Sequence, residues 1–197
     1  MTRWAGVPAD QRKDGRREML VGAGYRLFGD EGESALTVRA VCREAHLHTR
    51  YFYESFADTA QLLGAVYDEQ AVALGDVLAR AVETAEVSAR TRAGVRGVLR
   101  FISDDPRRGR VLFADAPSLA ARRRAAEQSL LDGLIAMSGR PRLGVLVAAT
   151  MFTGAMTQLA QQWADGRLGT DLDAVVDTAV DLALALQTRA TQPNVNA

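Results

Sequence analysis

Residues 36–63 read LTVRAVCREAHLHTRYFYESFADTAQLL, and this stretch decides the fold. The spacing of its apolar residues predicts a short helix over 37–45, for which Thr37 is a favourable N-cap. A break at His46 precedes a second short helix over 48–56. Each helix is too short to be stable alone in water, so the two must pack on each other and on a neighbouring helix. This is the helix-turn-helix arrangement, whose second helix lies in the DNA major groove.

Helical spacing continues outward from this stretch in both directions, and no run of residues alternates as a strand would. We therefore expect an all-α protein of about nine helices. Residues 1–13 are expected to form a flexible arm, Gly29 and Gly32 to end the first helix, and Asp58 to cap the fourth. The other expected helices span about 15–30, 58–85, 88–103, 117–137, 143–164 and 171–189, and Asp105-Pro106 is expected to open a further short helix.

The same pattern predicts two domains. Residues 1–57 would form an N-terminal arm and a helix-turn-helix domain, and residues 58–197 a helical domain. The segment 58–85 would be the linking helix, and 188–197 a flexible tail.

Composition excludes several classes of protein. The 197 residues carry 24 basic and 24 acidic side chains, so net charge gives no argument for binding nucleic acid or a membrane. The single cysteine, Cys42, excludes an intramolecular disulfide and fits an inert buried thiol. The uncharged segment 143–164 is long enough to span a bilayer, but its Thr and Gln residues favour a buried helix of a cytoplasmic protein over a membrane span.

The helix-turn-helix stretch resembles the DNA-binding signature of the tetracycline-repressor (TetR) family of bacterial transcriptional regulators. The shared features are a Thr-capped helix, an aromatic-rich second helix and a short polar step into the next helix. The resemblance covers about residues 14–67. The positions in register are Leu20, Ala23, Leu27, Phe28, Gly32, Thr37, Val38, Val41, Ala45, Leu47, Phe52, Tyr53 and Phe56.

Three positions depart from the family pattern. His46 replaces the usual Gly at the turn, where a positive φ is needed, and His can adopt that conformation at some cost. His48 replaces the usual Ser or Thr N-cap, although its ring could accept a hydrogen bond from a backbone N–H. Thr59 replaces a Lys at the start of the fourth helix and brings no charge. These departures leave open an alternative, in which the chain is a helical dimeric ligand-binding or adaptor protein with a degenerate DNA-binding head.

The resemblance implies roles for individual residues. Arg50 is the best candidate for reading guanine, beside Thr49 and Tyr51, whereas Tyr53 and Thr59 would hold phosphates. The basic residues of the first helix and its arm, among them Arg16 and Arg17, would either reach DNA or remain solvated. The full set of expected DNA-binding residues is Thr37, Arg39, His48, Thr49, Arg50, Tyr51, Tyr53 and Thr59.

Two apolar stripes predict a dimer. One runs along the last helix with a 4-3-4-3 spacing, and the other is a stripe of mostly small residues on the helix before it. Because that helix is apolar on two faces, one face would pack inside the monomer and the other against a second subunit, unless both faces are internal. The expected interface residues are Gly144, Ala148, Met151, Ala155, Leu172, Val176, Ala179, Ala183 and Leu186.

By the same resemblance, the helical domain would enclose a pocket for a small, largely apolar ligand, although a filled core fits the residue types as well. The expected lining is Leu99, Ile102, Phe113, Leu130, Leu134, Met137, Phe152, Met156, Leu159 and Trp163.

We expect neither catalysis nor a cofactor. His46 and His48 are the only histidines, and a metal site needs more ligands than these two. The Arg-rich runs at 107–110 and 122–124 read as solvated faces. The resemblance thus implies a two-fold dimer on a palindromic double-stranded operator, usually a repressor released by its ligand, although the sequence is also compatible with activation.

Overall fold

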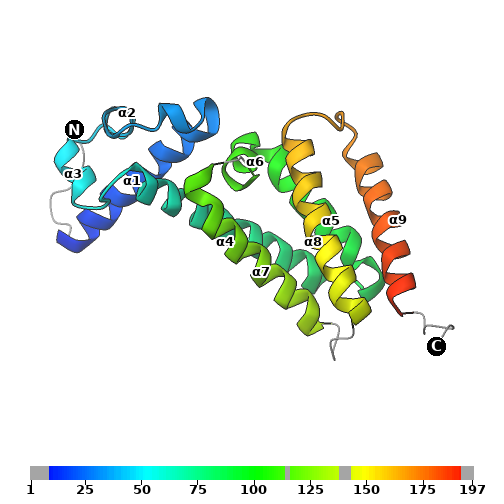
Figure 1. Cartoon of the computed structure of the whole chain (residues 1–197). Coiled ribbons are helices and arrows are strands. Elements are labelled where there is room, and N and C mark those ends of the chain that lie inside the picture. Colours follow the sequence, from blue (N-terminus) through cyan, green and yellow to red (C-terminus); the bar gives the residue numbers. More distant parts are fainter. Residues whose placement is uncertain (1–8, 114–115, 138–142, 192–197) are drawn as a thin grey trace.

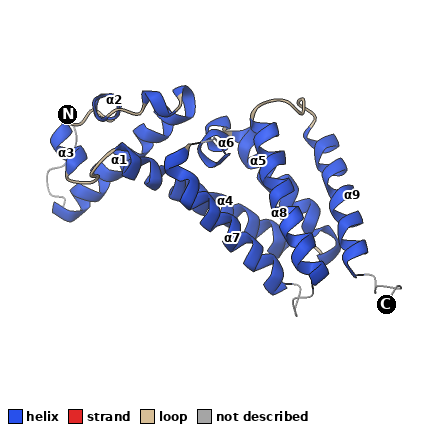
Figure 2. Cartoon of the chain, viewed as in Figure 1, coloured by secondary structure: helices blue, strands red, loops and turns tan. Residues whose placement is uncertain are grey.

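The computed structural model describes residues 9–113, 116–137 and 143–191 (Figure 1). Within these ranges every regular element is helical, which confirms the expected all-α class (Figure 2). The α-helices are α1 (Ala9–Glu31), α2 (Val38–Glu44), α3 (Thr49–Tyr53), α4 (Thr59–Thr84), α5 (Arg90–Asp104), α6 (Pro106–Phe113), α7 (Ala120–Met137), α8 (Leu143–Ala164) and α9 (Leu172–Thr191). Three short 3-10 turns cover Glu33–Ala35, Val87–Ala89 and Pro117–Leu119.

Helices α1–α3, which we call the head, lie at one end of the molecule, and α4–α9, which we call the body, extend from them (Figure 1). Helix α4 packs on α1 at its start and on α5 further along. Helix α6 contacts both α1 and α8, so it lies between the head and the most apolar helix of the body. Helices α8 and α9 pack side by side at the end far from the head (Figure 1).

Side-chain caps fix the starts of two helices where the sequence predicts them. The Thr37 hydroxyl accepts a hydrogen bond from the backbone N–H of Ala40 at 3.2 Å and opens α2. The Asp58 carboxylate accepts from the N–H of Gln61 at 2.7 Å and opens α4. Both bonds satisfy N–H groups that have no partner within the helix, which is why these residue types are favoured at this position.

Several helix ends differ from the prediction. Helix α1 begins at Ala9, so the part of the expected arm that lies within the described chain is helical. Gly29 lies inside α1 rather than at its end, and Gly32, at φ +84°, follows the helix. Helix α3 is shorter than expected, from Thr49 to Tyr53. Most of the expected C-terminal tail lies outside the described residues.

The core of the head is continuous with part of the body. Leu20, Val41, Phe52 and Leu62, from α1 to α4, are fully buried together. The same cluster includes residues of α5, α6 and the turn before α7: Phe101, Val111, Leu112, Ala116 and Leu119. Burial of such a side chain contributes about 1.5–3 kcal/mol. The contacts that stabilise the head therefore also fix α6 against it.

Helix α8 is the one helix of the described chain that is long and apolar enough to cross a membrane, which by itself is weak evidence for a span. It packs against α5, α6, α7 and α9. Only 17% of its most apolar window is buried in the monomer, however. Most of that apolar window is therefore half-buried or exposed in the single chain.

Candidate nucleic-acid interface

The turn between α2 and α3 depends on His46. Its φ is +53°, and it is the one non-glycine residue of the described chain with a positive φ. This conformation lets the N–H of Leu47 donate to the carbonyl of Cys42 at 2.9 Å and closes the end of α2. The prediction that His takes the place of the usual Gly at a positive φ is confirmed.

Helix α3 buries one face and exposes the other. Phe52 and Phe56 lie in the head core with ring centroids 5.9 Å apart, and Tyr53 meets Phe52 edge-on at 5.5 Å. Because the core anchors this face, the opposite side of α3 points to solvent, with Thr49 and Arg50 exposed. The exposed polar surface of α3 therefore comes from the residues predicted to read bases.

The other expected DNA-binding residues lie at the ends of helices. Thr37, Arg39 and His48 are exposed, and Thr59 is half-buried in the first turn of α4. His48 is the N-cap of α3, but its ring does not make the capping hydrogen bond that an imidazole could accept there. The first N–H groups of α3 consequently lack a side-chain cap, and the N–H of Tyr51 donates instead to the carbonyl of His48 at 2.9 Å.

Helix α1 supports α3 through two arginines. The guanidinium of Arg16 lies 4.5 Å from the centroid of the Tyr51 ring, and that of Arg17 lies 4.6 Å from the centroid of the Phe56 ring. Arg16 also pairs with Glu54 at 3.3 Å. These cation–π contacts fix α1 against α3. Sequence spacing alone did not reveal this support, because the partners are far apart in the chain.

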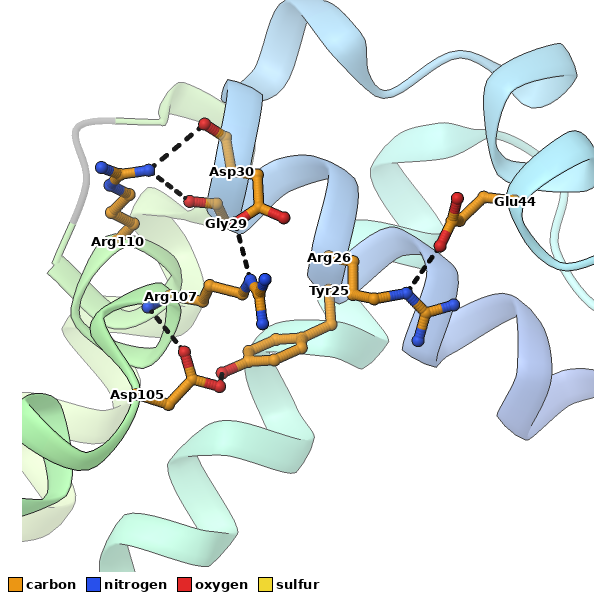
Figure 3. A network of polar contacts seen from close by, with 8 residues as sticks. All are labelled: Tyr25, Arg26, Gly29, Asp30, Glu44, Asp105, Arg107 and Arg110. Carbon is orange, nitrogen blue, oxygen red and sulfur yellow. Dashed lines mark hydrogen bonds and ion pairs between the residues drawn. The ribbon is translucent and has the colours of Figure 1, made fainter.

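A polar network joins the end of α1 to α6 (Figure 3). Arg107 Nε donates to Asp30 Oδ1 at 2.6 Å, and the Tyr25 hydroxyl donates to Asp105 Oδ2 at 2.7 Å. The hydrogen bond from Arg107 lowers the pKa of Asp30. Burial, together with the hydrogen bond to Asp105, raises the pKa of Tyr25 well above its ordinary value. The two shifts widen the pH range over which Asp30 stays ionised and Tyr25 stays protonated, which are the states that make these hydrogen bonds.

Arg110 supplies a cap that α1 itself lacks. The last turn of α1 has no basic residue. Arg110 Nη1 reaches over from α6 and donates to the carbonyls of Gly29 at 2.6 Å and Asp30 at 3.2 Å (Figure 3). A cation at this position satisfies free carbonyls and complements the negative end of the helix dipole.

The Arg-rich runs are therefore not simply solvated faces, and that expectation is wrong for most of their members. Arg108 Nη1 donates to the carbonyl of Phe101 at 3.1 Å. Arg122 pairs with Asp68 of α4 at 3.0 Å, and Arg123 donates to the carbonyl of Ala116 at 2.7 Å. These side chains fix helices against one another.

The far side of α6 meets the end of α8. A Cβ at Gly109 would lie 2.7 Å from Cβ of Ala164. The two helices therefore approach so closely that a residue larger than glycine at position 109 would push them apart. Beside this contact, Trp163 Nε1 donates to Ser103 Oγ at 2.9 Å. Helix α6 therefore contacts α8 through one face and α1 through another.

The residues predicted to line a ligand pocket lie together only in part. Phe152, Met156, Leu159 and Trp163 pack around the buried residues of α5 and α9, and Met156 and Trp163 also meet Ile102. Leu130 is exposed, and the side chains of Leu134 and Met137 lie outside the described part of the chain. Two open hollows, of about 410 and 520 Å³, lie elsewhere, between α4 and α5 and between α1 and α2.

The two stripes predicted for the dimer interface point in different directions. On α8, Met151 is 51% exposed and Ala155 is exposed, whereas the bulky stripe of that helix packs inward as expected. On α9 the prediction is wrong. Leu172, Val176, Ala179 and Ala183 are buried or half-buried within the monomer, where most of them pack on Val95 and Leu99 of α5, and the side chain of Leu186 is not described.

The acidic residues of α9 also turn toward α5. Asp173 pairs with Arg96 at 2.6 Å, and Asp177 pairs with Arg92. These ion pairs border the apolar seam and confirm which face of α9 meets α5.

Comparison with known proteins agrees with this geometry. Residues 20–66, which run from the second half of α1 to the first part of α4, match the family described as bacterial regulatory proteins, tetR family. The match includes the helix-turn-helix and the adjoining parts of the two helices that flank it.

Solved structures extend the likeness to the body. The fatty acid degradation regulator FadR from Bacillus halodurans has a TM-score of 0.74 at 17% identity, covering 86% of this chain and 94% of its own. A TetR-like transcriptional regulator from Rhodococcus sp. RHA1 has a TM-score of 0.70 at 20% identity, and the match covers 90% of this chain and 97% of that one. A tetR-family transcriptional regulator from Streptomyces coelicolor has a TM-score of 0.76 at 15% identity, and the match covers 90% of this chain and 82% of that one. Residues 20–66 thus match the tetR family of bacterial regulatory proteins, and the chain has the fold of the solved TetR-family structures.

Proposed function

We propose that the chain is a cytoplasmic, sequence-specific DNA-binding regulator that acts as a repressor on a palindromic operator. The observation that carries this proposal is the exposed polar side of α3, with Thr49 and Arg50, opposite the aromatic anchor Phe52. A helix held by its buried face presents its other face in one fixed orientation, as insertion into a major groove requires. The expected DNA-binding residues on α2, α3 and α4 make up this surface.

The active form would be a two-fold dimer formed through α8. Leu143, Val147 and Met151 of α8 are strongly exposed, as are Leu182 and Leu184 of the neighbouring α9. Exposed apolar side chains on adjacent helices favour burial against a second copy. Of the α8 residues predicted from the sequence, Met151 and Ala155 lie on this exposed surface, whereas Gly144 and Ala148 are half-buried in the monomer. The proposed surface replaces the α9 seam by the outer side of that helix.

A ligand would act through α6. A small, largely apolar molecule among Phe152, Met156 and Trp163 would move the end of α8, which Ala164 places against Gly109 of α6. Helix α6 in turn holds α1 through the polar network, so its displacement would change the spacing of the two heads in the dimer. The ligand would lower operator affinity by its differential affinity for the two states.

The decisive test is binding of the full chain to the DNA that flanks its own gene, measured by fluorescence anisotropy with excess random competitor over a series of salt concentrations. Specific binding should survive the competitor, and the salt dependence would count the phosphate contacts. If no complex survives, selection from a randomised duplex library tests whether the protein recognises any DNA sequence. A library from which nothing is enriched would overturn the proposal in favour of an adaptor with a degenerate head.

The ligand requires a separate test. Because FadR from Bacillus halodurans is named as a regulator of fatty acid degradation, a free fatty acid is a reasonable first probe. Release of bound operator by the fatty acid, lost on Trp163→Ala, would support the pocket. A Trp163→Ala protein that responds as the wild type does would contradict it.

A further inference from the structure

Glu54 is an acidic residue on the side of α3 that would face DNA. It lies four residues after Arg50, and its side chain is 38% exposed. A carboxylate in this position repels phosphates, so it weakens binding to DNA of any sequence. Its contacts indicate what it contributes in return.

The carboxylate of Glu54 holds two arginines. Its Oε1 lies 3.5 Å from Arg50 Nε, and its Oε2 lies 3.3 Å from Arg16 Nη2. Arg16 is the less exposed of the two, because it also packs over the Tyr51 ring of α3. Glu54 is therefore anchored to α1 through Arg16 while it contacts Arg50 on its own helix.

Tyr51 restrains the same arginine from another direction. The Arg50 guanidinium lies 5.0 Å from the Tyr51 ring centroid, and its Nη2 lies 3.4 Å from the Tyr51 hydroxyl. Nε lies at ion-pair distance from Glu54, and the Tyr51 hydroxyl can accept from only one N–H of Nη2, so each terminal nitrogen keeps an N–H for another acceptor. Arg50 is still 74% exposed, so that end of the guanidinium is open to a ligand. Two adjacent N–H donors are what guanine O6 and N7 accept.

We propose that Glu54 is a specificity-determining positioning residue, which orients Arg50 for guanine and at the same time disfavours non-cognate DNA. This inference rests on the proposed function, because it concerns how the same surface reads its operator. An arginine that is already oriented loses less side-chain freedom on binding, so its contact with the correct base is favoured over loose contacts with phosphates. The exposed ion pair itself contributes little to folding stability.

The proposal predicts opposite effects on two measurements. Glu54→Gln removes the charge and keeps the shape. It should strengthen binding to a random duplex by about 2-fold or more. It should also weaken discrimination by about 5- to 10-fold at one base pair of each half-site. A merely structural role would shift the affinity for all sequences alike.

The experiment uses the full chain, the operator selected by the wild type, every single-base variant of that operator, and a random duplex. Arg50→Ala identifies the base pair that Arg50 reads. Glu54→Gln should relax that same base pair, and the double variant should relax it no further than Arg50→Ala alone. Glu44→Gln is the matched control, because it removes the same charge from the head and breaks an ion pair with Arg26 instead. Thermal unfolding of each variant verifies that it is folded.

The results of this experiment separate a failure of the positioning role from a failure of the proposed function. Unchanged discrimination in Glu54→Gln, or relaxation at a base pair that Arg50→Ala leaves intact, would overturn the positioning role while the proposed function stands. The second of these results would mean that Glu54 reads a base itself. If the wild type selects no sequence, the proposed function fails and the positioning role fails with it.

Discussion

Arg107 of α6 crosses α1 at Gly29, where a Cβ on the glycine would lie only 2.5 Å from Cβ of the arginine. This contact brings Arg107 within reach of Asp30 and Arg110 within reach of the last carbonyls of α1. The absence of a side chain at one position of α1 is thus a condition for the polar network that joins the head to α6.

Gly29→Ala should separate α6 from α1. We expect a loss of about 1–3 kcal/mol in the free energy of unfolding, because the nearest atoms are Cβ and Cγ of Arg107, and Cβ cannot move away without its helix. Urea denaturation measures this loss. Gly22→Ala is the matched control within the same helix. Its Cβ would meet nothing closer than 3.6 Å, so it should stabilise by about 0.5–1 kcal/mol. Equal effects of the two substitutions would contradict the close contact at Gly29.

The pair of Asp30 and Arg107 should make stability depend on acid pH. Because the hydrogen bond from Arg107 lowers the pKa of Asp30 below its ordinary 3.8, the pair contributes stability above that pH. The contribution is lost as the pH falls through the lowered pKa of the folded state. Asp30→Asn should therefore be less stable than the wild type at neutral pH, and the difference should shrink below about pH 4. Arg107→Met should show the same pH dependence as Asp30→Asn. If either variant differs in stability from the wild type by the same amount at every pH, the ion pair is not the cause of the acid dependence.

His46 should carry a conformational cost that glycine does not. At φ +53° an L side chain is strained, so His46→Gly should stabilise the protein by about 1 kcal/mol through relief of that strain. The greater conformational entropy of glycine in the unfolded chain reduces this gain. His48→Gly provides the comparison, because His48 has an ordinary φ of −72° and should gain nothing. Thermal or urea unfolding of the two variants separates these cases. Destabilisation by both would show that the His46 ring makes a favourable contact that offsets the strain.

Arg50→Ala should lose about 1–3 kcal/mol of binding free energy on the selected operator and relax one base pair of each half-site. Titration of single-base operator variants by fluorescence anisotropy measures both effects. Arg90→Ala removes an exposed arginine from the body and should change neither. If Arg50→Ala weakens binding to every sequence equally, Arg50 contacts a phosphate rather than a base.

Ala155→Glu should convert the dimer to monomers, because it places a charge in the proposed apolar interface of α8, where Ala155 is exposed in the monomer. Sedimentation velocity distinguishes the two states. Ala125→Glu adds the same charge to an exposed position of α7 and should leave the dimer intact. A dimer that survives Ala155→Glu would exclude this part of α8 from the interface.

The sequence by itself determined the features that depend on near neighbours in the chain. Thr37 and Asp58 cap helices because each side chain accepts a hydrogen bond from the backbone N–H of the residue three positions later in the chain. The positive φ of His46 follows from a break between two helices that must pack on each other. The apolar stripes of α1 and α3 identified the buried residues of the head, since helical periodicity fixes which side chains share a face.

Only the tertiary structure decided which partner each stripe or charge meets. The spacing along α9 revealed an apolar seam, but Val176 packs on α5 of the same chain rather than on a second copy. Asp30 and Arg107 are 77 residues apart, and Arg16 and Glu54 are 38 apart, so no local pattern connects them. Periodicity gives the direction of a side chain relative to its own helix. The packing of whole helices, which depends on all their contacts at once, determines what lies in that direction.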